Sequence, residues 1–222
     1  MSERKSTGGI LPPDLAASMF AQAPGVHFDA GQAIYALGDR ADGMMLIDEG
    51  RIEISVTSIG GRKSVLNYMG AGELLGEIAA LDGGTRSADA VAATAVAGRT
   101  LSRRDAMGWI TTRPEAAQVV IAALCAKVRS ASDMFATQAT VTGRARLARG
   151  LLRLFDLWGT PGPEGSTLPH DFSQQEIGAF VGLARENVNR HMRTWSADGV
   201  LQHDGKRLVL RRRAALEAAC ED

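Results

Sequence analysis

The sequence of 222 residues predicts an α+β protein: a jelly-roll-like β-roll, then a long helix, then a small region of helices with a hairpin. Three observations lead to this expectation. Short apolar runs separated by glycines fill residues 26–100, residues 115–142 contain no glycine or proline, and residues 173–210 carry helix, turn, helix and hairpin signals in that order. We therefore expect a β-roll domain over residues 1–113, a helix and hinge over 114–143, and a third domain over 144–222.

The composition is that of an ordinary folded protein, with 45% hydrophobic and 23% charged residues. No apolar run reaches the ~18 residues of a membrane span, and Met1–Lys5 is not followed by the apolar segment of a secretory signal. We therefore expect a cytoplasmic protein without a membrane partner. Two cysteines, Cys125 and Cys220, are too few for a disulfide framework or a four-ligand metal site. We expect Cys125 to be a small buried apolar residue.

The net charge of zero conceals an uneven distribution. Residues 1–143 carry 13 basic and 15 acidic side chains, whereas residues 144–222 carry 12 basic and 10 acidic ones. A basic carboxy-terminal part is a modest indication of binding to phosphate backbones, and the alternative is a solvated surface.

Residues 26–100 are predicted to be rich in short strands, and a short helix over Asp14–Ala21 precedes them. Arg51–Val56 alternates polar and apolar residues, as a half-buried strand does, and the Gly60-Gly61 pair before Ser64–Tyr68 predicts a hairpin. Residues 101–113 are interpreted as a transition to the long helix.

The long helix is expected to begin at Pro114, because proline suits the first helical turn. Apolar side chains recur along it in steps of four and three residues, which is a heptad seam. Its members are Ala117, Ile121, Leu124, Val128, Ala131, Phe135 and Gln138. The seam favours pairing with a second copy of the chain, and the alternative is packing on its own domain.

After a break at Gly143, Arg144–Trp158 is predicted to form an amphipathic helix, followed by a loop over Gly159–His170. Ser173 and Glu176 form a capping-box pattern at the start of a helix that ends at Gly182. A second helix follows over Arg185–Ala197. The Asp204-Gly205 pair then predicts a tight hairpin turn, which completes the pattern of a winged helix-turn-helix.

The second helix of this motif has two faces. At ~100° per residue, Val188, Met192 and Trp195 share an apolar face. A polar face at the amino-terminal end carries four side chains: Arg185, Glu186, Asn189 and Arg190. Arginine can donate two hydrogen bonds to guanine, and glutamate can accept one from cytosine. We predict that this face reads DNA and that Lys206 and Arg207 of the hairpin contact phosphates. The alternative is a solvated face with internal ion pairs.

These motifs resemble the bacterial cyclic-AMP receptor (catabolite activator) family of the Crp–Fnr superfamily. The resemblance rests on Gln175–Gly178, Val181-Gly182, Arg185–Arg190 and the hinge-like Val141–Arg144. It implies base reading by the family's Arg, Glu and Arg positions, here at 185, 186 and 190, and DNA contacts from Ser173 and Gln174.

Two residues depart from the family pattern, since Ala184 replaces a capping Ser or Thr and Asn189 replaces a small residue. The resemblance further implies a homodimer with its reading helices about 34 Å apart on a two-fold symmetric site with G·C pairs in each half, and RNA polymerase as a partner.

The segment Gly76–Ala88 resembles the phosphate-binding cassette of cyclic-nucleotide domains. The candidate ligand-binding residues in it are Gly76, Glu77, Ile78, Ala79, Arg86, Ser87 and Ala88. Backbone N–H groups at a short helix and the Arg86 guanidinium would hold the cyclic phosphate, Glu77 would accept from the ribose 2′-hydroxyl, and Ser87 would add a hydroxyl. The alternative is a surface ion pair between Glu77 and Arg86.

Base recognition is the open point of this prediction. In the family a Thr-Ser pair of the long helix contacts adenine, with the Ser supplied by the partner subunit. Counting back from the hinge gives Arg129 and Ser130 at these positions. Because a guanidinium suits the guanine O6 acceptor, cyclic GMP remains an alternative to cyclic AMP.

Other inputs and functions are less favoured by the residues. No cysteine precedes Cys125 to hold an iron–sulfur cluster, and His27, Met44 and Met45 suit packing better than haem ligation. We expect no metal or haem. No Ser/His/Asp or paired-carboxylate set indicates an enzyme. We therefore expect a dimeric DNA-binding regulator that responds to cyclic AMP; the alternative from another class is a nucleotide-binding module that regulates a partner protein without binding DNA.

Overall fold

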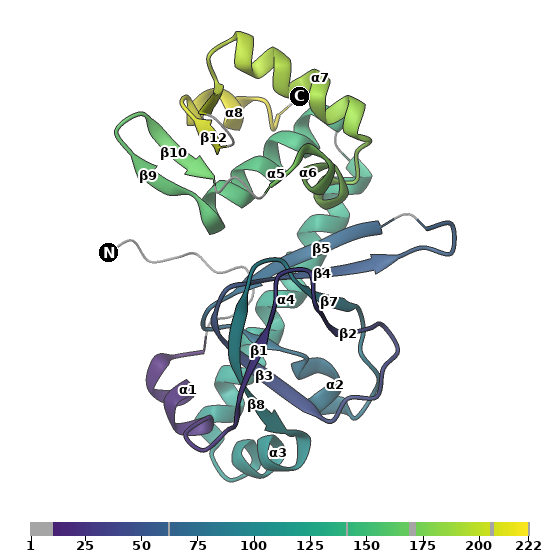
Figure 1. Ribbon diagram of the computed structural model, residues 1–222, viewed down its shortest axis with the longest axis vertical. Helices are drawn as coiled ribbons and strands as arrows, with labels where there is room; N and C mark the ends of the chain where they lie inside the picture. The colour runs from purple at the N-terminus through teal and green to yellow at the C-terminus, as the bar shows by residue number, and fades with distance from the viewer. Residues whose placement is uncertain (1–10, 62, 141, 169–171, 205–206, 222) are drawn as a thin grey trace. The chain divides into compact units, whose positions relative to one another are not determined.

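The computed structural model describes residues 11–61, 63–140, 142–168, 172–204 and 207–221, with the backbone alone for residues 130 and 133–140. The chain divides into two compact units, one of residues 7–130 and the other chiefly of residues 131–222. The division falls inside the long helix α4 (Pro114–Thr140) (Figure 1). The expected domain limits at residues 113 and 143 therefore stay predictions.

The first unit is built on two four-stranded antiparallel sheets, which confirms the predicted roll. One sheet has the order β1-β8-β3-β6 and the other β2-β7-β4-β5. The strands are β1 (Gly25–Phe28), β2 (Ala33–Tyr35), β3 (Gly43–Glu49), β4 (Arg51–Thr57), β5 (Lys63–Gly70), β6 (Leu74–Leu75), β7 (Asp89–Ala92) and β8 (Val96–Ser102). Side chains from both sheets, among them Met45 and Ile52, form one apolar cluster that holds them together.

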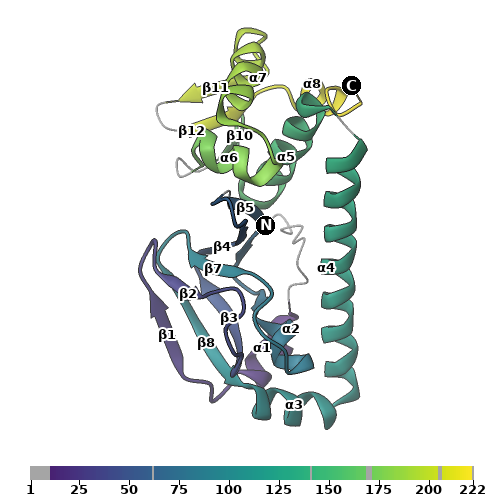
Figure 2. The same cartoon turned by 90° about the vertical axis from the view of Figure 1, so that its right-hand side faces the viewer.

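Helices cover the roll on one side. They are α1 (Pro13–Met19), α2 (Glu77–Asp82), α3 (Arg103–Thr111) and the amino-terminal half of α4 (Figure 2). A second apolar cluster joins α1, α3 and α4 to β3 through residues such as Phe20, Met44 and Val120. Helix α3 replaces the transition that we expected. Its signal is local, because the Ser102 hydroxyl accepts from the backbone N–H of Asp105 and caps the helix.

Strand β4 pairs with β5 as the predicted hairpin, with Glu53 opposite Tyr68. The expectation of a half-buried strand is wrong, because the polar face is buried as well: Arg51, Glu53 and Ser55 are all below 9% exposed. The Arg51 guanidinium lies 5.5 Å from the centre of the Tyr68 ring, and Glu53 forms an ion pair with Lys63. Charged side chains with such partners can occupy a buried face, so alternation alone did not reveal their burial.

The second unit is a helix-turn-helix with a four-stranded antiparallel sheet of order β11-β12-β10-β9. Its elements are α5 (Gly143–Trp158), β9 (Thr160–Gly162), β10 (Gly165–Leu168), α6 (Gln174–Val181), α7 (Arg185–Ala197), β11 (Leu201–Asp204), β12 (Arg207–Leu210) and α8 (Arg213–Ala218). The break before α5 lies at Thr142, whose hydroxyl accepts from Ala145 N–H, and not at Gly143. The predicted winged helix-turn-helix is confirmed.

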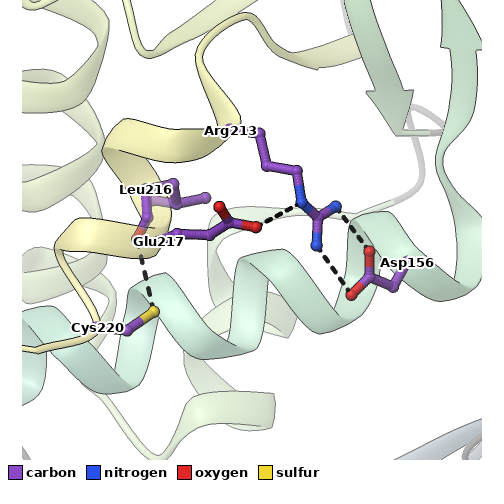
Figure 3. Close-up of polar contacts among 5 residues, drawn as sticks. All are labelled: Asp156, Arg213, Leu216, Glu217 and Cys220. Carbon is purple, nitrogen blue, oxygen red and sulfur yellow. Dashed lines mark hydrogen bonds and ion pairs between the residues drawn. The ribbon is translucent and has the colours of Figure 1, made fainter.

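Two parts of this unit were not predicted. Residues 159–168 form the β9–β10 hairpin in place of a loop, and β10 pairs with β12. Helix α8 packs on α5 (Figure 3), where the Arg213 guanidinium donates to both oxygens of Asp156 and to Glu217. The expectation that Cys125 is buried is wrong, because it is exposed on α4. The half-buried Cys220 thiol donates to the Leu216 carbonyl at 3.5 Å.

Candidate ligand and DNA sites

The predicted cassette folds into a turn around a left-handed glycine. Gly76 has φ 77° and precedes α2, so an L side chain is disfavoured there. A Cβ at Gly76 would also overlap the Arg86 guanidinium. Glycine therefore allows the arginine, ten residues later in the chain, to lie directly against the backbone at the start of α2.

Arg86 is a half-buried cation whose described contacts are all with uncharged groups. Its Nη1 donates to the Gly76 carbonyl at 2.9 Å, and the guanidinium carbon lies 4.4 Å from the centre of the Tyr35 ring. Among the described residues no carboxylate forms an ion pair with Arg86, and its buried Nε has no hydrogen-bond partner. The alternative of a Glu77–Arg86 surface ion pair is therefore not observed. A desolvated guanidinium with unused donors is suited to an anionic ligand.

The pKa of Tyr35 shows that the surroundings of Arg86 are shielded from water. Burial raises the pKa of its phenol to about 12, the Arg86 charge lowers it, and the Glu77 charge raises it. Desolvation thus outweighs the nearby cation. An anion placed beside Arg86 would be attracted more strongly here than at an exposed arginine, because the surrounding dielectric is low.

Glu77 is also buried, with 4% of its surface exposed. Its Oε1 accepts from the Lys127 ammonium of α4 at 2.8 Å, and the same ammonium donates to the Leu74 carbonyl at 3.1 Å. Sequence reasoning missed Lys127. The signal was helical phase, because Ala116, Val120 and Leu124, on the same side of α4 as Lys127, are buried or half-buried.

The remaining candidates divide by exposure. Ala79 and Ala88 are buried, so a ligand could meet only their backbone, whereas Ile78 and Ser87 are exposed. Arg129 is exposed, and at ~100° per residue it lies about 160° around α4 from Lys127. The structure therefore does not bring Arg129 to Glu77 of its own chain. The side chain of Ser130 lies outside the described residues.

The first helix of the DNA-reading motif begins with the predicted capping box. Glu176 N–H donates to the Ser173 hydroxyl at 3.2 Å, and Ser173 N–H donates to the Glu176 carboxylate at 2.6 Å. The Ser173 oxygen is thus engaged in capping, and Gln174 behind it is half-buried. Helix α6 ends at Gly182 with φ 70°, which turns the chain into α7.

Helix α7 has the bounds that the sequence predicted, and its start lacks a side-chain cap at Ala184, as expected. Val188, Met192 and Trp195 are buried, which confirms the apolar face. On the opposite side Arg185, Glu186 and Arg190 are exposed and Asn189 is half-buried. None of the three charged side chains forms an ion pair with a described residue, so the alternative of internal ion pairs is not observed.

The hairpin supplies one described candidate for phosphate contact. Arg207 is exposed opposite Asp204 in the β11–β12 register, whereas Lys206 lies outside the described residues.

Three consecutive arginines after this hairpin bind within their own unit. Arg211 contacts Gln202 at 2.8 Å and Glu164 at 2.9 Å, Arg212 donates to the Asp198 carbonyl at 3.2 Å, and Arg213 holds Asp156 and Glu217. These bonds attach the hairpin, the end of α7 and α5 to one another. These three arginines therefore serve the packing of the unit. Among its described candidates for DNA contact, the cations without an ion-pair partner are Arg185, Arg190 and Arg207.

The described ranges include no helix that is long and apolar enough to cross a membrane. They also contain no group of three His, Cys, Asp or Glu side chains that could hold a metal ion.

A β-roll with this cassette, joined to a winged helix-turn-helix, defines a DNA-binding protein with a nucleotide-sensing domain. Residues 25–112 match the family model of the cyclic nucleotide-binding domain, and residues 145–219 match that of the Crp-like helix-turn-helix domain. The chain belongs to the Crp/Fnr family of transcription regulators. It is a cyclic-nucleotide-binding, DNA-binding transcription regulator, as the resemblance implied.

Similar proteins cover nearly the whole chain. A CRP-like cAMP-activated global transcriptional regulator of Mycobacterium tuberculosis is 28% identical over 213 residues, 95% of either chain. The cyclic AMP receptor protein of Thermus thermophilus is 29% identical and covers 94% of this chain and 93% of its own. The structure of FixK2 from Bradyrhizobium japonicum superposes with a TM-score of 0.80 at 21% identity, over 89% of this chain and 96% of FixK2, which shows the shared fold.

Proposed function

We propose that this protein is a homodimeric transcription regulator whose binding to two-fold symmetric DNA is promoted by cyclic AMP. The observation that carries the proposal is the Arg86 guanidinium, which is desolvated beside Gly76 and Tyr35 and has no described counter-ion. A cyclic phosphate supplies one negative charge, and Arg86 can meet it with a charge-assisted hydrogen bond. Ser87 is exposed next to it and can add a hydroxyl donor.

Cyclic AMP is favoured over cyclic GMP by two considerations. The relatives from Mycobacterium tuberculosis and Thermus thermophilus are named for cyclic AMP. The case for cyclic GMP depended on Arg129 facing guanine O6, and Arg129 lies on the side of α4 away from Glu77. Glu77 would accept from the ribose 2′-hydroxyl, which both nucleotides carry.

Dimerisation through α4 is supported by the exposure of the heptad seam. Ile121 is 59% and Val128 65% exposed, while Leu124 between them packs partly on the roll. Large aliphatic side chains this exposed at heptad spacing gain stability when a second helix covers them. We propose a second copy of this chain as the occupant of the seam, through α4 of each copy.

DNA recognition would use the free polar face of α7. Arg185 and Arg190 can each donate two hydrogen bonds to a guanine, and Glu186 can accept from cytosine N4. Two copies would place their α7 helices in successive major grooves, about 34 Å apart. Ligand that binds one dimer arrangement better than the other shifts the population toward it. RNA polymerase is the partner through which such a regulator would act on transcription.

The proposal is tested with calorimetry and DNA binding on the same preparation. Cyclic AMP should bind the wild-type protein more tightly than cyclic GMP, and R86L should lose most of the affinity for both. The matched control is R104M on α3, an exposed arginine without a partner among the described residues, which should bind as wild type.

Cyclic AMP should also tighten binding to a symmetric G·C-containing DNA site. Unchanged nucleotide affinity in R86L, or absence of DNA binding with either nucleotide at low salt, would refute the corresponding half of the proposal.

A further inference from the structure

The α4 side of the cassette contains an ion pair that the family resemblance did not indicate. The Lys127 ammonium donates at 2.8 Å to Oε1 of Glu77 and at 3.1 Å to the Leu74 carbonyl. Leu74 belongs to β6 and Glu77 begins α2, so one cation bonds the backbone before Gly76 and the side chain after it. The side chains of Glu77 and Lys127 are 5% and 22% exposed. The pair is thus largely shielded from water.

Burial makes Glu77 depend on this partner. A carboxylate removed from water is costly unless a cation or hydrogen-bond donors compensate it. Arg86 does not serve this purpose, because its guanidinium bonds the Gly76 carbonyl and stacks on Tyr35. The two cations beside the cassette therefore have separate partners, and the cation that compensates Glu77 comes from α4.

The geometry leaves one oxygen of the Glu77 carboxylate available to accept a hydrogen bond. The Lys127 ammonium contacts Glu77 through Oε1, and Oε2 has no hydrogen-bond partner among the described residues. An ionised carboxylate only accepts hydrogen bonds, so the available oxygen selects for a hydroxyl donor. A ribose 2′-hydroxyl can bond Oε2 while Lys127 remains on Oε1.

We propose that Lys127 is the positioning residue for ribose recognition: its ammonium fixes the Glu77 side chain through Oε1 and leaves Oε2 free for the nucleotide 2′-hydroxyl. The inference rests on the proposed function. Removal of the ammonium takes away the donor that fixes this buried carboxylate, so the side chain turns toward water and is weakened as a fixed acceptor. The effect falls on the 2′-hydroxyl and not on the phosphate, since Arg86 keeps its own contacts.

The test compares cyclic AMP with 2′-deoxy cyclic AMP by calorimetry. Wild-type protein should prefer cyclic AMP by about tenfold or more, the range of a hydrogen bond to a charged group. In K127M this ratio should fall to within about threefold of one, with a much smaller change in affinity for the deoxy analogue. K127R, whose guanidinium can make the same two bonds, should restore most of the preference. R104M should keep the wild-type ratio.

A double-mutant cycle separates positioning from general damage to the fold. If Lys127 acts through Glu77, K127M should have no further effect on the ratio in an E77Q background, where E77Q/K127M also leaves no buried unpaired charge. Thermal unfolding of each variant followed by circular dichroism shows that it is folded. If K127M keeps the wild-type preference for cyclic AMP over 2′-deoxy cyclic AMP, the inference about Lys127 is overturned and the proposed function is not. Wild-type protein that binds neither nucleotide overturns the proposed function and the inference together, and wild-type protein that binds both nucleotides equally overturns the ribose role of Glu77.

Discussion

Single charged residues in this protein differ mainly in whether a partner within the chain satisfies them. Arg213 and Arg211 are held by carboxylates, whereas Arg86, Arg185 and Arg190 have no described counter-ion. A satisfied arginine contributes to packing, and an unsatisfied one retains its full capacity to bind phosphate or a base edge. The distinction identifies Arg211 and Arg213 as structural residues, which sequence alone does not.

At Arg185 we expect an effect confined to one base pair. R185A should relax the preference at one G·C pair of each half-site by about 1–3 kcal/mol, because a bidentate contact to guanine is lost. R207A serves as the contrast, and should weaken binding to all sequences alike with a lower salt dependence. Fluorescence anisotropy on a panel of single-base variants measures both. A uniform loss for R185A would reassign that residue to a phosphate contact.

His191 of α7 makes the carboxy-terminal unit sensitive to acid. Burial lowers the pKa of its imidazole below the ordinary 6.5, and the charges of Arg190 and Arg144 lower it further. The unfolded chain therefore binds the proton more readily than the folded one. The stabilising contribution is complete above pH 6.5, declines as the pH falls through that value, and levels off below the folded-state pKa.

This linkage is measurable by urea unfolding at pH 7.5 and pH 5.5. The wild-type protein should lose more stability between the two values than H191Q, which carries no proton to gain. Carboxylates that titrate in the same range contribute equally to both proteins, so the difference isolates the imidazole. An equal loss in the two proteins would show that His191 does not take up a proton in this interval.

At the scale of elements, helices with local sequence signals were predicted, whereas elements that depend on distant pairing were missed. The bounds of α7 and the capping box of α6 were predicted because their determinants lie within a few residues of each helix end. The β9–β10 hairpin was missed because β10 is held by β12, some forty residues away. Helix α8 was missed because it depends on packing against α5.

The candidate site shows the same limit. Arg86 and Glu77 were identified from a contiguous motif, whereas Lys127 follows fifty residues later on another helix. Counting residues back from the hinge gave Arg129, which lies about 160° around α4 from Lys127, and its contact with the ligand stays a prediction. A count along the chain fixes a position in sequence, but only packing of α4 on the roll fixes which side chains reach the ligand site.

The contact between α8 and α5 has an apolar part and an ionic part, whose contributions to stability can be compared. Leu216 is fully buried, so L216A should destabilise the carboxy-terminal unit by about 2–5 kcal/mol through lost packing and a cavity. R213A should cost about 1 kcal/mol or less, since Arg213, Asp156 and Glu217 are each more than 40% exposed and water screens their attraction. Urea unfolding of both variants measures the difference. Equal losses would mean that the ion pairs in Figure 3 dominate the contact.

At the scale of the whole molecule, each unit is folded around its own apolar cluster or sheet, and the long helix belongs partly to both. Its roll-facing side carries Val120 and Lys127, and the adjacent side carries Ile121 and Val128. The proposed ligand contact and the proposed dimer seam thus lie on neighbouring sides of one helix. A small rotation of α4 about its axis would affect both, which makes this helix the natural two-state element of the regulator.

The seam itself provides the test of assembly. The double variant I121E/V128E should sediment as a monomer at micromolar concentration, because four like charges would meet in the dimer in place of apolar contacts. It should still bind cyclic AMP, since the cassette contacts of Glu77 and Arg86 lie within one chain. Binding to the symmetric DNA site should weaken strongly, because each monomer presents a single reading helix. The control A122E places its charge on an exposed position about 140° around α4 from the seam and should remain a dimer. A dimeric I121E/V128E protein would show that the two copies associate through another surface.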